Sequence, residues 1–183
     1  DRVADETFAQ GRASPAVVVF VPLHEQRERM DEYSFGTNSS RGDRFRAFLA
    51  DTLVPLVDAA FPTRADVAQR GITGASLGGL MSSYVAWGRN DRFQLVGSQS
   101  GSYFWVDDKE LLTHEMRAGE KRTLRLYVDN GSPGDNERSN ASFVQMLKDR
   151  GYPHVHVVEP GGRHEWPDWA RRWPAMLAYL FPP

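Results

Sequence analysis

The chain has 183 residues, no cysteine, and 22 basic against 24 acidic side chains, which gives a net charge of -2; 40% of its residues are hydrophobic. This length suffices for one soluble domain with a substantial core. Without cysteine the chain can form no disulfide framework, thiolate metal site or cysteine nucleophile. The near-neutral balance argues against binding to nucleic acid or to an anionic membrane surface, because such binding needs clustered excess Lys and Arg.

The sequence shows no segment that would cross or enter a membrane. No apolar run approaches the length of a membrane span, and the N-terminus lacks the basic and then apolar pattern of a signal segment. The chain starts at Asp1 and not at a methionine, so we expect that something upstream of it was removed or left out. Localisation stays open between cytoplasm and export, since the absence of cysteine fits both.

Five short apolar runs predict strands. The longest, at residues 16–21, is rich in valine, lacks polar alternation and stops at Pro22, which indicates a strand buried on both faces, as in a parallel sheet. Gly, Pro or Asn residues bound the other runs, which lie at residues 71–73, 95–97, 124–128 and 155–158.

Helical patterns separate these runs. One helix is predicted from apolar residues spaced at i, i+3 and i+4, with Pro55 expected to kink or end it near Val54: Phe45, Phe48, Leu49, Leu53, Leu56 and Val57. Further helices are expected at residues 80–87, 141–147 and 169–180, and residues 3–8 could form the tail of another. This alternation predicts one α/β domain over residues 1–183, with a mostly parallel sheet and helices on both faces.

The most specific motif is a GxSxG pattern, Gly74-Ala75-Ser76-Leu77-Gly78, between a short apolar strand and a helix. A serine on so sharp a turn has a strained backbone and a projecting hydroxyl, and its neighbours two residues away must lack side chains for close chain approach. The helix N-terminus adds free N–H groups, of which the Leu77 N–H could bind a developing oxyanion. The alternative, a glycine-rich turn with an incidental serine, is disfavoured by the strand–helix context.

A serine nucleophile needs a base, and His164 is the best candidate among the five histidines. It lies in a glycine-rich loop directly after the 155–158 run. In a parallel sheet this loop is at the carboxyl edge of the strands, the same edge as Ser76.

The other histidines have weaker claims. His154 and His156 alternate on one strand and share a face, but without a third ligand nearby ordinary edge-strand histidines are favoured over a metal site. His114 is expected to be a solvated helical residue. His24 follows the first predicted strand at the functional edge, so it is a candidate substrate contact.

The imidazole also needs a carboxylate to fix its tautomer. The loop after the 124–128 run contains three acids, Asp129, Asp135 and Glu137. An acid from this loop obeys the chain order serine, acid, histidine of hydrolases with a strand–helix elbow. Asp135 is preferred over Asp129 because it lies further into the loop; its alternative role is the N-cap of a helix that begins around Glu137.

With these residues in place, the chain resembles the esterase family of α/β-hydrolases that includes enterochelin (siderophore) esterases, esterase D-like enzymes and feruloyl esterases. The resemblance covers essentially the whole chain. It rests on the strand at residues 17–21 and on six blocks: Arg29-Met30-Asp31-Glu32-Tyr33, Phe48-Leu49 with Leu53-Val54-Pro55, the elbow Gly74 to Leu80, Ser98-Gln99-Ser100-Gly101-Ser102-Tyr103-Phe104-Trp105, Gly131-Ser132-Pro133-Gly134-Asp135, and Gly161-Gly162-Arg163-His164-Glu165-Trp166-Pro167-Asp168-Trp169.

The resemblance implies ester hydrolysis through an acyl-enzyme. Ser76 would attack the carbonyl carbon, His164 would take the proton and return it to the leaving alcohol, and Asp135 would orient His164. The Leu77 N–H would be one oxyanion donor. The implied substrates are small-molecule siderophore, phenolic or acyl esters, and no metal or cofactor is implied.

The resemblance also suggests substrate contacts. Arg29 and Glu32 are expected to form a structural ion pair, with Arg29 binding an anionic or phenolic acyl group as the alternative. Tyr103, Phe104 and Trp105 could form an aromatic wall for a catecholate or phenolic ester, or they could simply pack in the core.

One departure from the family pattern concerns the sheet. The second oxyanion donor of α/β-hydrolases comes from a loop that would precede the strand at residues 17–21, and a further strand would lie between that strand and the 71–73 strand. Without it, two parallel edges would carry unpaired backbone groups. We therefore expect that the chain is the C-terminal two-thirds of a longer protein, completed by a missing N-terminal segment or by a second chain; the oligomeric state stays open.

Two alternatives to hydrolysis stay open at this point. One is a catalytically silent hydrolase-fold module used for binding, and the other is an acyltransferase with the same triad, in which an alcohol other than water accepts the acyl group. Sequence does not separate hydrolysis from transfer, because the outcome depends on how the site excludes water.

Overall fold

A parallel sheet forms the centre of the molecule. The computed structural model describes residues 2–22, 28–36, 41–105 and 109–183. In this part of the chain four strands pair in the order β1-β2-β3-β4, all parallel: Gly71–Ala75, Leu95–Gln99, Arg125–Ser132 and His154–Pro160. The predicted strands at residues 71–73, 95–97, 124–128 and 155–158 and the parallel α/β sheet are therefore confirmed.

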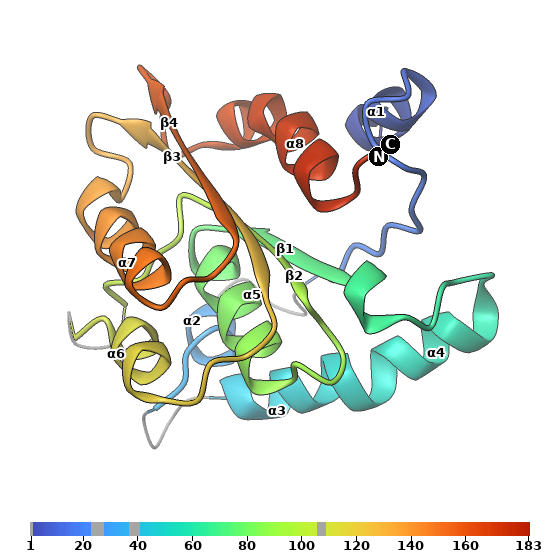
Figure 1. Ribbon diagram of the computed structural model, residues 1–183, viewed down its shortest axis with the longest axis horizontal. Coiled ribbons are helices and arrows are strands. Elements are labelled where there is room, and N and C mark those ends of the chain that lie inside the picture. Colours follow the sequence, from blue (N-terminus) through green and yellow to red (C-terminus); the bar gives the residue numbers. More distant parts are fainter. Residues whose placement is uncertain (1, 23–27, 37–40, 106–108) are drawn as a thin grey trace.

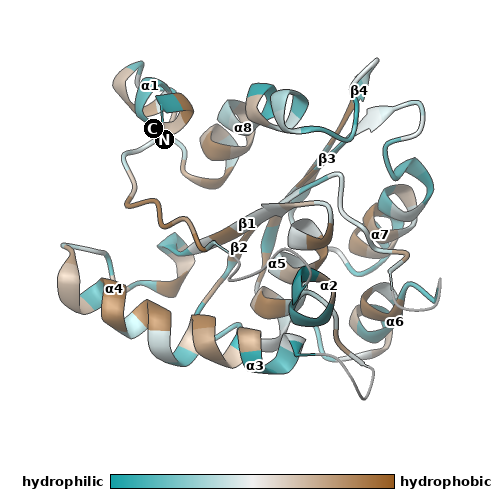
Figure 2. Cartoon of the chain, turned by 180° about the vertical axis from the view of Figure 1, so that it is seen from behind, coloured by the Kyte–Doolittle hydropathy of each residue, from teal (hydrophilic) through white to brown (hydrophobic). Residues whose placement is uncertain are grey.

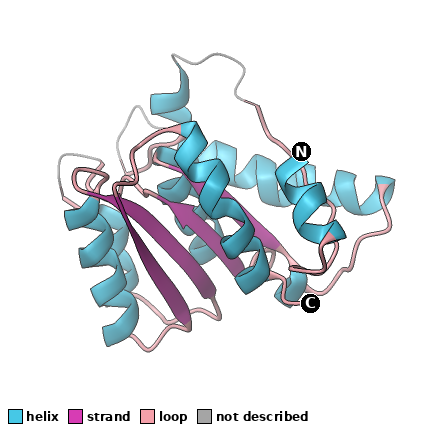
Figure 3. Cartoon of the chain, turned by 90° about the horizontal axis from the view of Figure 1, so that it is seen from above, coloured by secondary structure: helices cyan, strands magenta, loops and turns pink. Residues whose placement is uncertain are grey.

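Helices cover both faces of this sheet (Figures 1 and 3). On one face lie α5 (Leu77–Gly88), α6 (Leu111–Ala118) and α7 (Glu137–Asp149), and on the other face lie α8 (Trp166–Leu180) and α1 (Arg2–Ala9). The remaining helical elements precede β1: α2 (Arg29–Glu32), α3 (Gly42–Ala47), the π-helix η2 (Phe48–Leu53), α4 (Val54–Ala60) and the 3-10 turn η3 (Val67–Gln69). None of the described helices is long and apolar enough to cross a membrane.

The main core lies between the sheet and helices α5 to α7. Its largest fully buried side chains include Tyr103, Phe143 and Leu80. Helix α5 is buried almost all round, which explains why its sequence is apolar without a polar stripe (Figure 2). A smaller core under α8 contains Met176 and Leu180 packed on β2 and β3.

Pro55 lies where the helix changes from π-type to α-type. The helical path continues from α3 through η2 into α4, and Pro55 is the second residue of α4. Proline has no N–H and clashes with the carbonyl four residues earlier, so the preceding turn must open. The wider π-turn at Phe48–Leu53 provides that room. The predicted kink or end near Val54 therefore takes the form of a π-to-α transition.

The strand predicted at residues 16–21 is absent. Residues 14–22 have no regular secondary structure and pair with no strand. Val17, Val19 and Phe20 are 47%, 43% and 59% exposed, and Figure 2 shows this apolar stretch as a brown loop between α1 and β1. Strand propensity measures how well side chains suit a sheet, but pairing requires a neighbour, and β1 pairs only with β2 among the described residues.

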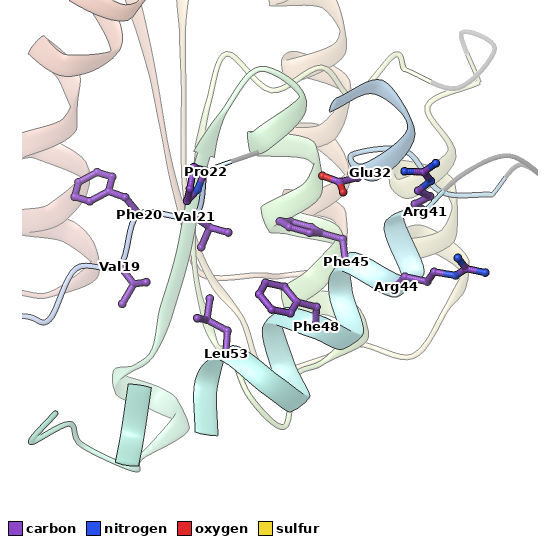
Figure 4. Close-up of a pocket in the computed structure, with 10 residues that line it drawn as sticks. All are labelled: Val19, Phe20, Val21, Pro22, Glu32, Arg41, Arg44, Phe45, Phe48 and Leu53. Atoms are coloured by element: carbon purple, nitrogen blue, oxygen red, sulfur yellow. The ribbon is translucent and has the colours of Figure 1, made fainter. Parts of the chain in front are cut away.

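An apolar groove of about 490 Å³ lies between this extended segment and the α3–η2 helix. Figure 4 shows Phe45, Phe48 and Leu53 on the helix side and Val19 and Val21 on the segment side. Glu32, Arg41 and Arg44 lie toward one end of it. The side of the sheet at β1 is therefore apolar and only partly covered.

We expect this open edge to be measurable by hydrogen exchange. The amides of β1 should exchange faster than those of β2 and β3. Each of β2 and β3 is hydrogen-bonded to a neighbouring strand on both edges, whereas among the described residues β1 has a neighbouring strand on one edge. NMR-detected exchange of the isolated chain tests this, with β4, the other edge strand, as an internal reference. Protection of β1 equal to that of β2 would contradict the expectation.

Candidate functional site

The turn between β1 and α5 holds Ser76 in a strained conformation. Ser76 has φ 60 and ψ -125, a backbone region that residues with a side chain rarely adopt. Its N–H donates to the Gln99 carbonyl oxygen at 2.9 Å, which fastens the turn to β2. The predicted strained turn between strand and helix is present.

The close chain approach at this turn depends on Gly74. A Cβ on Gly74 would lie 2.5 Å from the carbonyl carbon and oxygen of Gly78. A Cβ on Gly78 would meet only Tyr33, at 3.8 Å, which is ordinary contact. The expectation that both neighbours must lack side chains is therefore correct for Gly74 and wrong for Gly78. The second tight position is Gly79, whose Cβ would lie 2.5 Å from Ser98 Oγ.

The groups around Ser76 are polar. Its Oγ lies 3.2 Å from Ser102 Oγ in a buried hydrogen bond. Leu77 is the first residue of α5, and no oxygen of the described residues accepts its N–H. The turn thus presents a hydroxyl and an open amide at the carboxyl edge of the sheet.

Asp135 and His164 meet at the same edge. His164 Nδ1 donates to Asp135 Oδ1 at 2.6 Å, with the carboxylate 1% and the imidazole 37% exposed. Asn136 occupies the N-cap position of α7 and no side chain caps that helix, so the alternative role of Asp135 as N-cap is excluded. The structure brings Asp135, and not Asp129, to His164, as the position in the loop predicts.

Two further donors hold the other oxygen of this carboxylate. Asp135 Oδ2 accepts from the Gly131 N–H and from Ser100 Oγ, both at 2.6 Å. Burial alone would raise the pKa of Asp135, but the hydrogen bonds from His164, Ser100 and Gly131 outweigh it and hold the pKa below its ordinary value. Asp135 is therefore a buried anion at neutral pH.

Ser100 is the centre of this hydrogen-bond network. Its Oγ donates to Asp135 and accepts from Trp169 Nε1 at 2.9 Å and from Arg172 Nη2 at 3.0 Å. Its backbone also has a positive φ of 49. Beyond its place in the 98–105 block, Ser100 cannot be selected from the sequence, because the partners of its hydroxyl lie 35 to 72 positions away.

Arg172, from α8, supplies positive charge beneath the network. Its buried guanidinium lies 2.9 Å from Asp129, 3.1 Å from Glu159 and 3.6 Å from Asp135. Burial raises the pKa of Asp129 to about 6, although Arg172 acts in the opposite direction. Asp129 also accepts from Gln99 Nε2, so it belongs to this structural cluster. Sequence reasoning missed Arg172, because its place in an amphipathic helix does not show that it points inward.

The loops that contain Asp135 and His164 touch through glycine. A Cβ on Gly131 would lie 2.1 Å from the carbonyl oxygen of Gly162. Backbone atoms form this contact, so no side-chain movement could relieve a clash. The contact fixes how far apart the two loops can lie.

Two predicted substrate contacts lie in different environments. Tyr103 is completely buried, stacks on Phe143 with ring centroids 3.8 Å apart, and donates its hydroxyl to Ser98 Oγ. Its prediction as part of a substrate wall is wrong, and the packing alternative is correct. Trp105 is half-buried and donates from Nε1 to Ser34 Oγ at 2.7 Å.

The predicted ion pair between Arg29 and Glu32 is not formed. The Arg29 guanidinium lies over the Tyr33 ring, 5.7 Å from its centroid, and Glu32 lines the apolar groove. The cation–π contact with Tyr33 takes the place of the expected ion pair. The alternative, Arg29 as a ligand contact, stays a prediction.

The remaining histidines are placed as ordinary structural residues, apart from His24, which lies outside the described residues. His154 Nδ1 donates to the Tyr152 carbonyl oxygen, and His156 Nε2 donates to Asn130 Oδ1 at 2.9 Å. Burial lowers the pKa of His156. His114 is exposed on α6, as predicted.

Comparison with known sequences identifies the family of this fold and site. The sequence profile of the family described as "Putative esterase" matches residues 1–180. The chain belongs to this esterase family. The resemblance noted from the sequence blocks is thereby confirmed.

Individual members of the esterase family are distant relatives. An endo-1,4-beta-xylanase/feruloyl esterase from Xylanibacter ruminicola is 26% identical over 180 residues, which cover 98% of this chain and 23% of that protein. The iron(III) enterobactin esterase of Escherichia coli is 29% identical over 140 residues, which cover 72% of this chain and 34% of that enzyme.

Solved structures show the same fold. The enterobactin esterase of Shigella flexneri superposes with a TM-score of 0.83 at 24% identity, covering 96% of this chain and 46% of that one. A ferulic acid esterase superposes with a TM-score of 0.76 at 17% identity, covering 98% and 75%. These superpositions show the predicted α/β-hydrolase fold, and the chain spans less than half the length of the enterobactin esterases it matches.

The alanine variants of Gly74 and Gly78 should differ in their free energy of unfolding. Gly74→Ala should lower the free energy of unfolding by about 1–3 kcal/mol, because its Cβ meets the Gly78 backbone. Gly78→Ala should leave it unchanged or raise it by up to about 1 kcal/mol, because the position is open and alanine favours a helix. Urea unfolding measures both, and equal losses would contradict the steric explanation.

Removing the Ser100 hydroxyl should raise the pKa of Asp135. Ser100→Gly is suitable because glycine tolerates the positive φ. A carboxyl group whose pKa is lowered in the folded state stabilises the fold at pH values above its ordinary pKa of about 4. This stabilisation is lost as the pH falls through the lowered pKa. The variant should therefore lose less stability on acidification. Carboxyl-carbon NMR titration measures the pKa, and an unchanged value would show that Gly131 and His164 alone set it.

Proposed function

We propose that this chain is a serine carboxylic-ester hydrolase that works through an acyl-enzyme, with Ser76, His164 and Asp135 as its catalytic triad. The observation that supports this best is the 2.6 Å bond between the buried, ionised Asp135 and His164. It lies at the sheet edge where Ser76 is held on a strained turn. Membership of the esterase family agrees with this chemistry.

The proposed reaction needs each of these groups in turn. Ser76 Oγ attacks the ester carbonyl carbon while His164 Nε2 takes the hydroxyl proton, and the negative charge moves to the carbonyl oxygen. The tetrahedral intermediate collapses, the carbon–oxygen bond of the ester breaks, and His164 gives the proton to the leaving alcohol. Water, deprotonated by His164, then cleaves the acyl-enzyme. Asp135 stays ionised throughout and stabilises the imidazolium.

We assign one oxyanion donor to the Leu77 N–H. The amide lies directly after the nucleophile at the start of α5, where the helix dipole also favours negative charge. The second donor is proposed to come from a segment that packs beside this turn but is not among the described residues.

The proposed substrates are small siderophore, phenolic or simple acyl esters. The related enzymes are named as enterobactin and feruloyl esterases. Arg29, Trp105 and His24 are the proposed ligand contacts; Arg29 would attract an anionic or phenolic group. No observation favours a silent binding module or an acyltransferase over this reaction.

We further propose that an additional extended segment, from the same protein or a second chain, pairs with the free edge of β1. It would satisfy open backbone groups and cover the groove beside Phe45 and Phe48. With that segment bound, the β1 amides should exchange as slowly as those of β2. Exchange as fast as in the isolated chain would contradict this arrangement.

Esterase activity and a fluorophosphonate probe test the triad. The native protein should hydrolyse p-nitrophenyl acetate, methyl ferulate or an enterobactin-type trilactone and should be labelled at Ser76. Ser76→Ala should abolish labelling, and His164→Gln should lower kcat by about 10³-fold or more. His154→Gln, a histidine at the opposite end of β4, is the matched control and should keep full activity.

Product analysis separates hydrolysis from transfer. Turnover that rises when alcohols are added, with formation of new esters, would favour transfer to an alcohol. A native protein that is inactive on every ester and unlabelled at Ser76 would overturn the proposed enzyme.

A further inference from the structure

Ser102 contacts the proposed nucleophile through two separate groups. Its backbone N–H donates to the Ser76 carbonyl oxygen at 3.1 Å, and its Oγ lies 3.2 Å from Ser76 Oγ. Ser102 is 4% exposed, so water hardly competes for this hydroxyl. The side chain of Ser76 has no other hydrogen-bond partner in the described part of the chain.

The side-chain amide of Asn136 favours one direction of this hydrogen bond. Asn136 Nδ2 lies 2.8 Å from the Ser100 carbonyl oxygen, which can only accept, so this atom of the amide is the donor. The same nitrogen lies 3.4 Å from Ser102 Oγ. Ser102 Oγ accepts from Asn136 with one lone pair and keeps its own proton, which it can donate to Ser76 Oγ.

A donor on Ser76 Oγ leaves the serine proton free for the base. If Ser76 donated to Ser102 instead, its proton would point at Ser102 and would have to turn to the base before each attack. With Ser102 as donor, a lone pair of Ser76 Oγ is occupied and the hydroxyl proton is directed elsewhere. This arrangement favours the rotamer that general-base catalysis needs.

One tripeptide links both ends of the proposed triad. Ser100 donates to the Asp135 carboxylate, and Ser102, two residues later, bonds to Ser76. Asn136 lies next to Asp135 and bonds to both serines of the tripeptide. Residues 100–102 after β2 therefore hold the acid and the nucleophile in one frame.

From this geometry we infer that Ser102 is a positioning residue for Ser76: its hydroxyl donates to Ser76 Oγ and directs the serine proton toward His164. The inference rests on the triad proposed above. During acylation the Ser76 proton moves to His164 and the new bond forms between Ser76 Oγ and the carbonyl carbon. Ser102 keeps its own proton and releases nothing to substrate or product.

The test compares acylation rates in single and double variants. Ser102→Ala removes the hydroxyl, and Asn136→Gly removes the amide while glycine tolerates the φ of 57. Ser98→Ala is the matched control: Ser98 is a buried serine of β2 whose hydroxyl bonds to Tyr103, and among the described residues no hydrogen bond of its side chain reaches Ser76. Rates are measured by stopped-flow burst of p-nitrophenyl acetate and by fluorophosphonate labelling, with the labelled fraction counted by intact mass.

We expect Ser102→Ala to acylate about tenfold more slowly, with an unchanged substrate dissociation constant from the burst kinetics and with full final labelling. Asn136→Gly should have a smaller effect that largely disappears in the Ser102→Ala background, because the amide acts through the hydroxyl. Ser98→Ala should acylate at the native rate.

Three results would overturn the inference. They are a native acylation rate in Ser102→Ala, a slower rate explained wholly by a smaller labelled fraction, and additive effects of the two substitutions. Each of these leaves the triad intact as long as the native protein is labelled at Ser76. A native protein that is not labelled would instead refute the proposed function itself.

Discussion

Taking the Asp135 carboxylate out of water costs several kcal/mol unless donors replace its lost hydration. The fold supplies them from three separate places in the chain: the Gly131 amide, the Ser100 hydroxyl and His164. Gly131 lies four residues before Asp135 on the same stretch of chain, whereas Ser100 follows β2 and His164 follows β4. The carboxylate is therefore fully bonded only when the loops after β2, β3 and β4 meet. The architecture of this edge of the sheet follows from that requirement.

A buried ion cluster around Arg172 lies beneath the Asp135 carboxylate. Arg172 is buried with Asp129 and Glu159 around it and also reaches Ser100, so it ties α8 to the strands. A buried ion cluster of this kind contributes little net stability compared with apolar packing, but breaking one member leaves an unpaired charge. Its effect is therefore on geometry: it fixes the orientation of Ser100, and through Ser100 that of the acid.

Local sequence patterns predict much of this protein. Apolar runs locate β1 to β4, and the elbow motif with chain order selects Ser76, Asp135 and His164 as candidates. The run at residues 16–21 misleads because pairing depends on a neighbouring strand, which no property of the run itself reveals. Ser100 and Arg172 are not detected for a related reason: the contacts that join them to the acid and to each other span 35 to 72 positions, and neither belongs to a motif with known chemistry.

Backbone strain is concentrated around the site. Ser76, Ser100 and Asn136 have positive φ values although none is glycine, and all three lie in one hydrogen-bond network. Replacing a residue of positive φ by glycine relieves backbone strain, and elsewhere in a protein this is one way to raise the melting temperature. In this protein the positions that such substitutions would target are Ser76, Ser100 and Asn136, which hold the polar network together. Greater heat resistance obtained at these positions would come at the expense of the site, so stabilising changes belong on the helices away from it.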